Sequence, residues 1–415
     1  MNKKLLSNTL TVVLLGSTTY LSADDGINIL SDIKIKGELR PRYEIAAVSD
    51  NTLEKAQAFT NRTHLVISSK LLNVDNLVAI IGLQSVNNFG FTNYSLPATA
   101  PKKYEVINDP NAAMLSEASL EYKLGNTKAH AGRSQLNLDN QRFIGTVGWR
   151  QLERSYDTLS VTNNDIENFN IFVAYLYGYG GVGSVTTTET NSVLLHAKYK
   201  VSELLNITAY DYMLGSVSDT YGLALTGKLG KEMKLSYRGE YAQQSNPTLE
   251  YGTTNVKADA YYVNLDLATN ISGFIAGLNY ELLSGSDASK TTFNPKLGTN
   301  HKFNGWADVF YVGANGTPTG GLIDANLRLG YKTKGFGKLL AFYHNFTSDK
   351  KMSSATGTTN NLGSEIDIVY VNKISYVNGL TGLAKFASYS KGDVNSFANA
   401  QNDKQVAWLQ VDYKF

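Results

Sequence analysis

The 415-residue sequence contains no cysteine, only 7 prolines and only 5 histidines. The absence of cysteine excludes a disulfide framework and every thiolate metal site. No segment approaches the roughly 18–20 consecutive apolar residues that a transmembrane helix requires. Charged residues make up 18% of the chain and the mean hydropathy is -0.22, values that exclude both a disordered chain and a helical membrane protein.

The amino terminus predicts a secreted protein. Two lysines precede an interrupted apolar run at 5–15, and small residues follow as far as Ala23. This pattern is typical of a secretory signal peptide over 1–23, which leaves 24–415 as the mature domain. Removing the two lysines leaves 38 − 2 = 36 basic and 36 acidic residues. With no basic excess to neutralise phosphates, we expect no nucleic-acid partner.

The last ten residues alternate between an apolar and a polar face, as a β-strand does. The apolar set is Phe415, Tyr413, Val411, Leu409 and Ala407, and the polar set is Lys414, Asp412 and Gln410. Ending on an aromatic residue within a strand is typical of bacterial outer-membrane proteins. We therefore expect two partners for the mature domain, outer-membrane lipid and the barrel-assembly machinery, the latter through the strand that ends at Phe415.

The first mature strand has the same period and a more extreme polar face. Apolar residues, Gly37 and Pro41 alternate there with a face made only of charges: Lys34, Lys36, Glu38, Arg40, Arg42 and Glu44. A wholly charged face is unusual in a soluble sheet but suits the wall of a water-filled lumen.

Alternating segments recur about every 20 residues, and we count 18 of them, although those near 127–134 and 205–214 are weak. Every second connection is short: 73–76, 125–126, 202–204, 229–232, 333–335 and 376–379. The others are mostly long: 45–57, 88–113, 135–153, 178–190, 243–256, 284–320, 348–361 and 391–404, with Gly215–Ser218 as an exception. Short turns at one end and long loops at the other are typical of outer-membrane barrels. The sequence predicts an all-β fold, a transmembrane antiparallel barrel of about 18 strands with short periplasmic turns and long extracellular loops.

Two loops are too polar for lipid-facing strands and too rich in arginine, tryptophan and glycine for plain connections. They are 132–157, with Asp139, Arg142, Gly145, Trp149, Arg154 and Asp157, and 293–308, with Trp306 and Asp308. Together with the Gly37–Glu44 stretch, they resemble the alginate-export porin family. The resemblance implies a monomeric 18-stranded barrel whose arginine-lined lumen conducts an anionic saccharide.

The candidate pore-lining or solute-binding residues come from this resemblance and from the inward faces of the strands. They are Arg40, Arg42, Arg62, Arg133, Arg142, Arg154, Arg238 and Glu117. A second interpretation stays open for Arg142 and Arg154, which would then tie their loop to the wall through Asp139 and Asp157.

The five histidines, His64, His130, His196, His301 and His344, form no short catalytic or zinc-binding motif. No cofactor motif or calcium loop is present either, so we assign no enzymatic activity, metal or cofactor. We expect a porin in the outer membrane of a Gram-negative bacterium, through which small hydrophilic solutes, anionic ones or saccharides among them, diffuse passively. The alternatives are a dedicated exporter channel for an acidic polysaccharide and a surface adhesin or receptor barrel.

Overall fold

The computed structural model describes residues 29–49, 52–230, 235–251, 257–286, 291–310 and 317–415. The predicted signal peptide therefore lies outside the described residues. Within the described part the helices are two three-residue 3-10 turns, η1 (Asn300–Lys302) and η2 (Ala398–Ala400). Neither is long and apolar enough to cross a membrane.

Eighteen strands account for most of the described chain, as the alternation predicted. In chain order they are β1 (Leu30–Val48), β2 (Ala56–Leu71), β3 (Val74–Asn87), β4 (Ala112–Leu124), β5 (Thr127–Ser134), β6 (Ser155–Asn163), β7 (Phe169–Gly180), β8 (Thr187–Ser202), β9 (Leu205–Leu214), β10 (Ser218–Leu229), β11 (Leu235–Ser245), β12 (Asp259–Ile271), β13 (Phe274–Leu283), β14 (Leu322–Thr333), β15 (Gly337–Ser354), β16 (Gly357–Lys373), β17 (Leu380–Lys391) and β18 (Lys404–Lys414).

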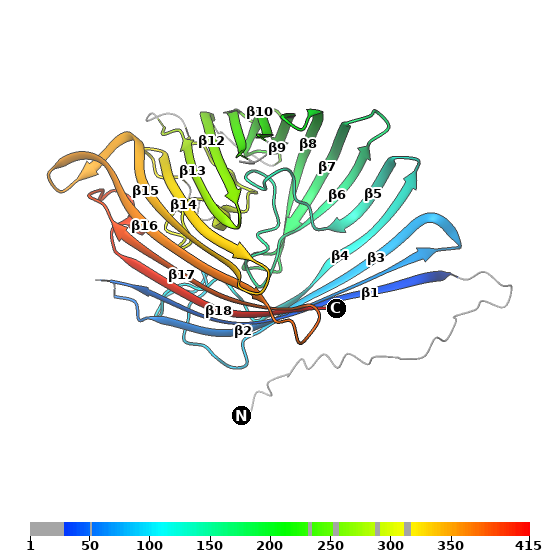
Figure 1. The fold of residues 1–415 in the computed structure, drawn as a ribbon, viewed down its shortest axis with the longest axis horizontal. Helices are drawn as coiled ribbons and strands as arrows, with labels where there is room; N and C mark the ends of the chain where they lie inside the picture. The colour runs from blue at the N-terminus through cyan, green and yellow to red at the C-terminus, as the bar shows by residue number, and fades with distance from the viewer. Residues whose placement is uncertain (1–28, 50–51, 231–234, 252–256, 287–290, 311–316) are drawn as a thin grey trace.

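The strands form one closed antiparallel barrel (Figure 1). Each strand pairs with its neighbours in sequence, and β1 pairs with β18 to close the sheet, with Tyr43 opposite Leu409. The last residue completes this seam, because the backbone of Phe415 exchanges two hydrogen bonds with that of Gly37, at 2.9 and 3.0 Å. A Cβ at Gly37 would lie 2.2 Å from the tip of the Phe415 ring, so a larger residue there would displace the terminal aromatic.

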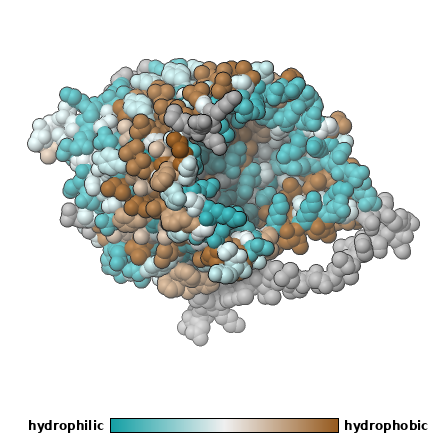
Figure 2. Space-filling model, viewed as in Figure 1, coloured by the Kyte–Doolittle hydropathy of each residue, from teal (hydrophilic) through white to brown (hydrophobic). Residues whose placement is uncertain are grey.

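The alternation places apolar side chains outside and charged ones inside. On β1, Ile33 and Ile35 are more than half exposed, whereas Arg40 and Arg42 are buried. The barrel therefore presents an apolar outer wall to its surroundings and turns its charges inward. Figure 2 shows the same division, with hydrophobic residues gathered on the outer wall over β14–β16 and hydrophilic residues around the hollowed centre.

The predicted asymmetry of the connections is confirmed, with two differences in detail. The expected loop at 348–361 is a two-residue turn, because β15 and β16 continue as a long hairpin to Ser354 and Gly357. The exception at Gly215–Ser218 is a three-residue turn, which stands at the same end of the barrel as the long loops.

The structure of β9 explains why the alternation of apolar and polar residues is weak in segment 205–214. Its inward positions carry Tyr210 and Tyr212, which are buried although they face the lumen. They pack against Phe143 from the β5–β6 loop, with ring centroids 5.4 and 6.4 Å apart. Phe143 also contacts Tyr262 of β12, at 5.3 Å. The hydrophobic core of this protein therefore lies inside the barrel, where a loop supplies the apolar partner.

Candidate functional site

Three long connections pack against the inward-facing side chains of the strands (Figure 1). We call them the β3–β4 loop (88–111), the β5–β6 loop (135–154) and the β13–β14 loop (284–321). The amide of Gly145 donates to the carbonyl of Leu297 at 3.0 Å, which joins the second loop to the third. The amide of Gln151 donates to Asp109 at 2.9 Å, which joins the second loop to the first. The loops thus form one hydrogen-bonded insert.

Arg40 and Arg42 fix this insert to the first strand. The Arg40 guanidinium donates to Glu38, to Asp412 and, at 2.8 Å, to the carbonyl of Gly148. Arg42 is fully buried and donates to the carbonyl of Trp149 at 2.5 Å, with its guanidinium carbon 4.2 Å from the Trp149 ring centroid. Both predicted arginines therefore face the lumen and hold the β5–β6 loop.

Arg62 and Glu117 lie farther round the same wall. Arg62 of β2 is buried and forms ion pairs with Glu153 at 2.7 Å and with Glu38 at 3.4 Å. Glu117 of β4 faces His64 at 3.6 Å and keeps 15% of its side chain exposed. Arg40, Arg42 and Arg62 therefore each have a carboxylate partner on this wall or on the insert.

Arg142 tethers its loop to the opposite side of the barrel. Its guanidinium is fully buried and meets Glu281 of β13 at 2.9 Å and the amide oxygen of Asn304 at 2.9 Å. Arg154 donates to the carbonyls of Gly145 and Leu297, at 3.1 and 2.5 Å. Both residues tie the loop in place, but through these partners and not through the expected aspartates.

The two aspartates serve the remaining predicted arginines. Asp139 pairs with Arg238 of β11, which also meets Glu240 at 2.7 Å. Asp157 pairs with Arg133 at 2.6 Å. Arg133 lies on the same face of β5 as the exposed Ala131, and the buried His130 lies on the other face. The structure therefore does not bring Arg133 together with the lumen arginines.

Sequence reasoning missed a buried cation that contacts the insert, Lys385 on β17. Its ammonium lies 3.9 Å from the ring centroids of Trp149 and Trp306 and 4.9 Å from that of Trp408. These are the three tryptophans of the whole chain. They come from the β5–β6 loop, the β13–β14 loop and β18, so a single ammonium holds both loops against the wall. The small number of tryptophans in the chain was the sequence feature that could have drawn attention to this cluster.

A chain of hydrogen bonds continues from Lys385 across the insert. The ammonium lies 2.7 Å from Nε2 of His301, whose Nδ1 lies 2.7 Å from Asp308. Burial lowers the pKa of the His301 imidazole to about 3, so the neutral ring accepts from Lys385 and donates to Asp308. Burial alone would raise the pKa of Asp308, but His301 and Arg150 outweigh it and leave that pKa below its usual range.

Arg150 completes this chain by joining the loops to the first strand. It meets Asp308 at 2.8 Å and Glu44 of β1 at 3.2 Å. Sequence reasoning placed Arg150 in an unusual loop but gave it no partner. The two loops and the wall are therefore linked by one continuous chain of hydrogen bonds and ion pairs.

Two carboxylates of β16 hold the β13–β14 loop through its backbone. The amide of Ala307 donates to Glu365 at 2.7 Å, and the amide of Trp306 donates to Asp367 at 3.1 Å. Gly305 precedes them with a φ of +84°, and a Cβ there would lie 2.5 Å from the Glu365 carboxylate. Glycine is therefore required for the loop to approach β16 so closely.

Among the residues that the structure describes, no group of three or more histidine and carboxylate side chains is placed to hold a metal ion. The side chains gathered inside the barrel are paired charges, amide groups and tryptophan rings. Fixed charges of this kind are what confers ion selectivity on pores.

Comparisons with known proteins give structural matches only. No protein-family model matches the chain, and no curated protein matches it. The structure of OccK8 (OprE) from Pseudomonas aeruginosa matches with a TM-score of 0.69 at 18% identity, over 92% of this chain and 98% of that one. OccAB4 from Acinetobacter baumannii matches with a TM-score of 0.70 at 16% identity, over 93% and 98%.

A third matching structure was solved with a small organic solute. OpdK from Pseudomonas aeruginosa, solved with vanillate, has a TM-score of 0.68 at 13% identity, over 92% of this chain and 98% of that one. Identities this low relate folds and not substrates. The chain has the closed 18-stranded barrel fold of the Occ and Opd outer-membrane proteins.

Proposed function

We propose that the protein is an outer-membrane porin that lets small hydrophilic solutes diffuse passively, anionic solutes and saccharides among them. The observation that carries this proposal is the closed barrel with an apolar outer wall and a charged lumen narrowed by three loops. A closed barrel satisfies every backbone group of the sheet, which membrane insertion requires. The fold shared with the Occ and Opd structures supports the same conclusion.

The sequence supports an outer-membrane location. A signal peptide over 1–23 would deliver the chain to the secretory pathway, and the strand that ends at Phe415 would be read by the barrel-assembly machinery. The terminal residue completes the β1–β18 seam, which gives it a structural role as well. Short epitope tags inserted near 185, 250 and 355 should react with antibody on intact cells, and tags near 75, 203 and 334 should not. The reverse labelling would contradict this orientation.

Liposome swelling tests the transport proposal. Proteoliposomes that contain the folded barrel are diluted into isotonic solutions of sugars and organic acids of increasing size. We expect swelling rates that fall steeply with solute size, because the inserted loops restrict the path. Liposomes with heat-denatured protein are the control. Swelling no faster than in that control, for every solute, would refute the proposal.

A dedicated exporter of an acidic polysaccharide is the second candidate, favoured by the arginine-rich loops and by the resemblance to the alginate-export porins. The lumen arginines nevertheless have carboxylate partners. We therefore expect an acidic oligosaccharide to interrupt ion current no more often than a neutral one of the same length. A strong preference for the acidic chain would favour the exporter. Binding to cell surfaces without any solute flux would instead favour an adhesin.

A further inference from the structure

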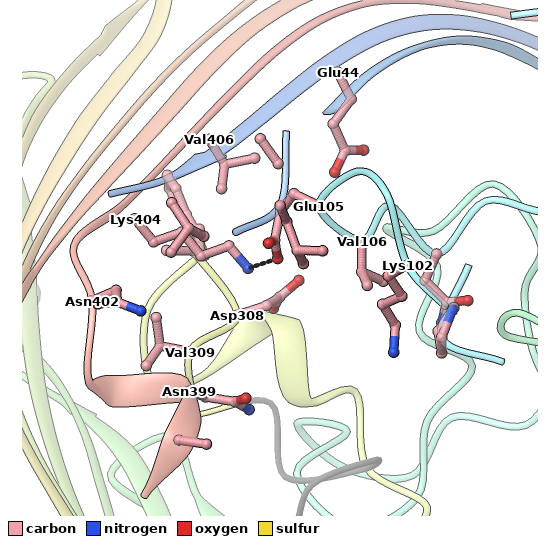
Figure 3. Close-up of a pocket in the computed structure, with 18 of the residues that line it drawn as sticks. Glu44, Lys102, Glu105, Val106, Asp308, Val309, Asn399, Asn402, Lys404 and Val406 are labelled. Carbon is pink, nitrogen blue, oxygen red and sulfur yellow. Dashed lines mark ion pairs between the residues drawn. The ribbon is translucent and has the colours of Figure 1, made fainter. Parts of the chain in front are cut away.

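A cavity of about 370 Å³ opens above the insert, at the end of the barrel that carries the long loops (Figure 3). Its walls come from β1, the β3–β4 loop, the β13–β14 loop and the β17–β18 connection (392–403) with the start of β18. Arg150 of the β5–β6 loop also lines it, so all three loops of the insert contribute to the cavity.

The charges of the cavity are balanced. Three carboxylates line it, from Glu44, Glu105 and Asp308, and three cations face them, from Lys102, Arg150 and Lys404. Their formal sum is zero. In a site of this kind the three carboxylates repel a simple anion, and the three cationic side chains repel a simple cation. A solute that carries both charges meets a favourable partner at each end.

One of the ion pairs in the cavity, which we call the loose pair, is longer than the others. The Lys404 ammonium and the Glu105 carboxylate are 3.7 Å apart, beyond hydrogen-bonding distance, and both side chains retain some exposure. Asp308, by contrast, is held by His301 and Arg150 at 2.7 and 2.8 Å. In Figure 3 the Glu105 and Lys404 groups lie next to each other, joined by a dashed line, and the Asp308 carboxylate lies close to them.

Apolar surface lies beside this loose pair. Trp306, Trp408 and Val406 line the cavity, together with Val48 and Val309. An aliphatic or aromatic stem laid on these side chains would leave water while its charged end reaches the pair. The cavity thus combines an anionic acceptor, a cationic donor and an apolar wall within one small volume.

We propose that this cavity binds zwitterions with an apolar stem, the class of α-amino acids, on their way into the barrel. The solute's ammonium contacts Glu105, its carboxylate contacts Lys404, and its stem packs on the tryptophan and valine side chains. The proposal rests on the proposed porin function and names a solute class for it. The protein's own ion pair is exchanged for two pairs with the solute, so no unpaired charge remains.

The test compares three probes that differ by one charged group. Norleucine carries both charges, hexanoate lacks the ammonium and pentylamine lacks the carboxylate. Binding is followed by intrinsic tryptophan fluorescence, because two of the three tryptophans line the cavity. We expect norleucine to shift the emission saturably and to bind roughly tenfold or more tightly than either analogue, since each analogue lacks one charged contact. Equal binding by hexanoate would overturn the proposal in favour of simple anion binding.

Variants of the loose pair identify the contacts. Glu105→Gln and Lys404→Gln should each reduce norleucine affinity by roughly tenfold. The exchanged variant, Glu105→Lys with Lys404→Glu, keeps both charges and should recover most of the binding. Lys103→Gln is the matched control, because Lys103 neighbours the cavity in sequence but pairs with Glu54 at 3.5 Å outside it. Unchanged affinity in both single variants would refute the assignment.

Ion current through the same protein separates this proposal from the porin function. Norleucine should interrupt the current of single channels, and the Glu105→Gln variant should conduct with fewer interruptions. A conducting channel whose current and fluorescence ignore norleucine overturns the zwitterion site and leaves the porin intact. Fluorescence binding without any conductance leaves the site intact and overturns the porin.

Discussion

Replacing Lys385 with methionine should release the β5–β6 and β13–β14 loops from the barrel wall while the barrel stays closed. Methionine matches the length of the stem and removes only the ammonium. That ammonium contacts three tryptophan rings at 3.9–4.9 Å and donates to His301 at 2.7 Å. The same change leaves Asp367 and Asp308 with one cation fewer nearby.

The expected loss of loop-docking free energy follows from these contacts. A desolvated cation–π contact is worth about 2 kcal/mol, and the three rings share one charge, so their contributions do not add fully. The acceptor left unpaired on His301 costs about 1–3 kcal/mol. Breaking a buried charge network from one side usually costs about 3–5 kcal/mol. We expect the loops to lose about 3–5 kcal/mol of docking free energy.

Tryptophan emission is the assay, because all three tryptophans of the chain contact Lys385. In Lys385→Met the emission maximum should move to longer wavelength at a much lower urea concentration than in the parent. Far-UV circular dichroism of the strands should keep the parent's midpoint. Lys391→Met, an exposed position on the same strand, is the control. Coinciding emission transitions in parent and variant would refute the reasoning.

Three further predictions follow from the same contacts. Deleting Phe415 should lower assembly in the outer membrane without reducing secretion, and equal amounts of heat-modifiable barrel in mutant and parent membranes would count against it. Loop docking, followed by tryptophan emission, should weaken as the pH falls from about 6.5 toward about 3. In that pH range the His301 imidazole takes up a proton when the loop is released but stays neutral when the loop is docked. The His301→Gln variant should lack this pH dependence. The double variant Arg40→Ala with Arg42→Ala leaves their carboxylate partners uncompensated and should shift ion selectivity toward cations, most clearly at low salt; an unchanged reversal potential in the folded variant would place these arginines away from the narrowest point.

The barrel could be predicted from the sequence because its determinants are local. Alternation fixes which side of each strand faces lipid, and the lengths of the connections fix the two ends. The first strand shows this well, since its wholly charged face pointed inward before any contact was known. The long hairpin after Phe346 was missed because its polar, glycine-containing sequence carries no alternation there.

The site could be predicted only in part because its contacts are not local. Arg142 was identified as unusual, yet its partner Glu281 lies 139 positions away in sequence. Lys385 gives no sign of its three tryptophan neighbours, which come from two loops and a strand. Tyr210 and Tyr212 concealed the parity of β9, because an inward aromatic resembles an outward one until the loop that covers it is known.

Single-channel recording of the purified barrel in a planar bilayer tests the central claim most directly. The strands close into one barrel and three loops enter its lumen, so the account predicts discrete conductance steps that rise with salt concentration. Lys385→Met should give larger or noisier steps, because its loops no longer stay against the wall. Heat-modifiable, folded protein that inserts into the bilayer and carries no current would contradict the account.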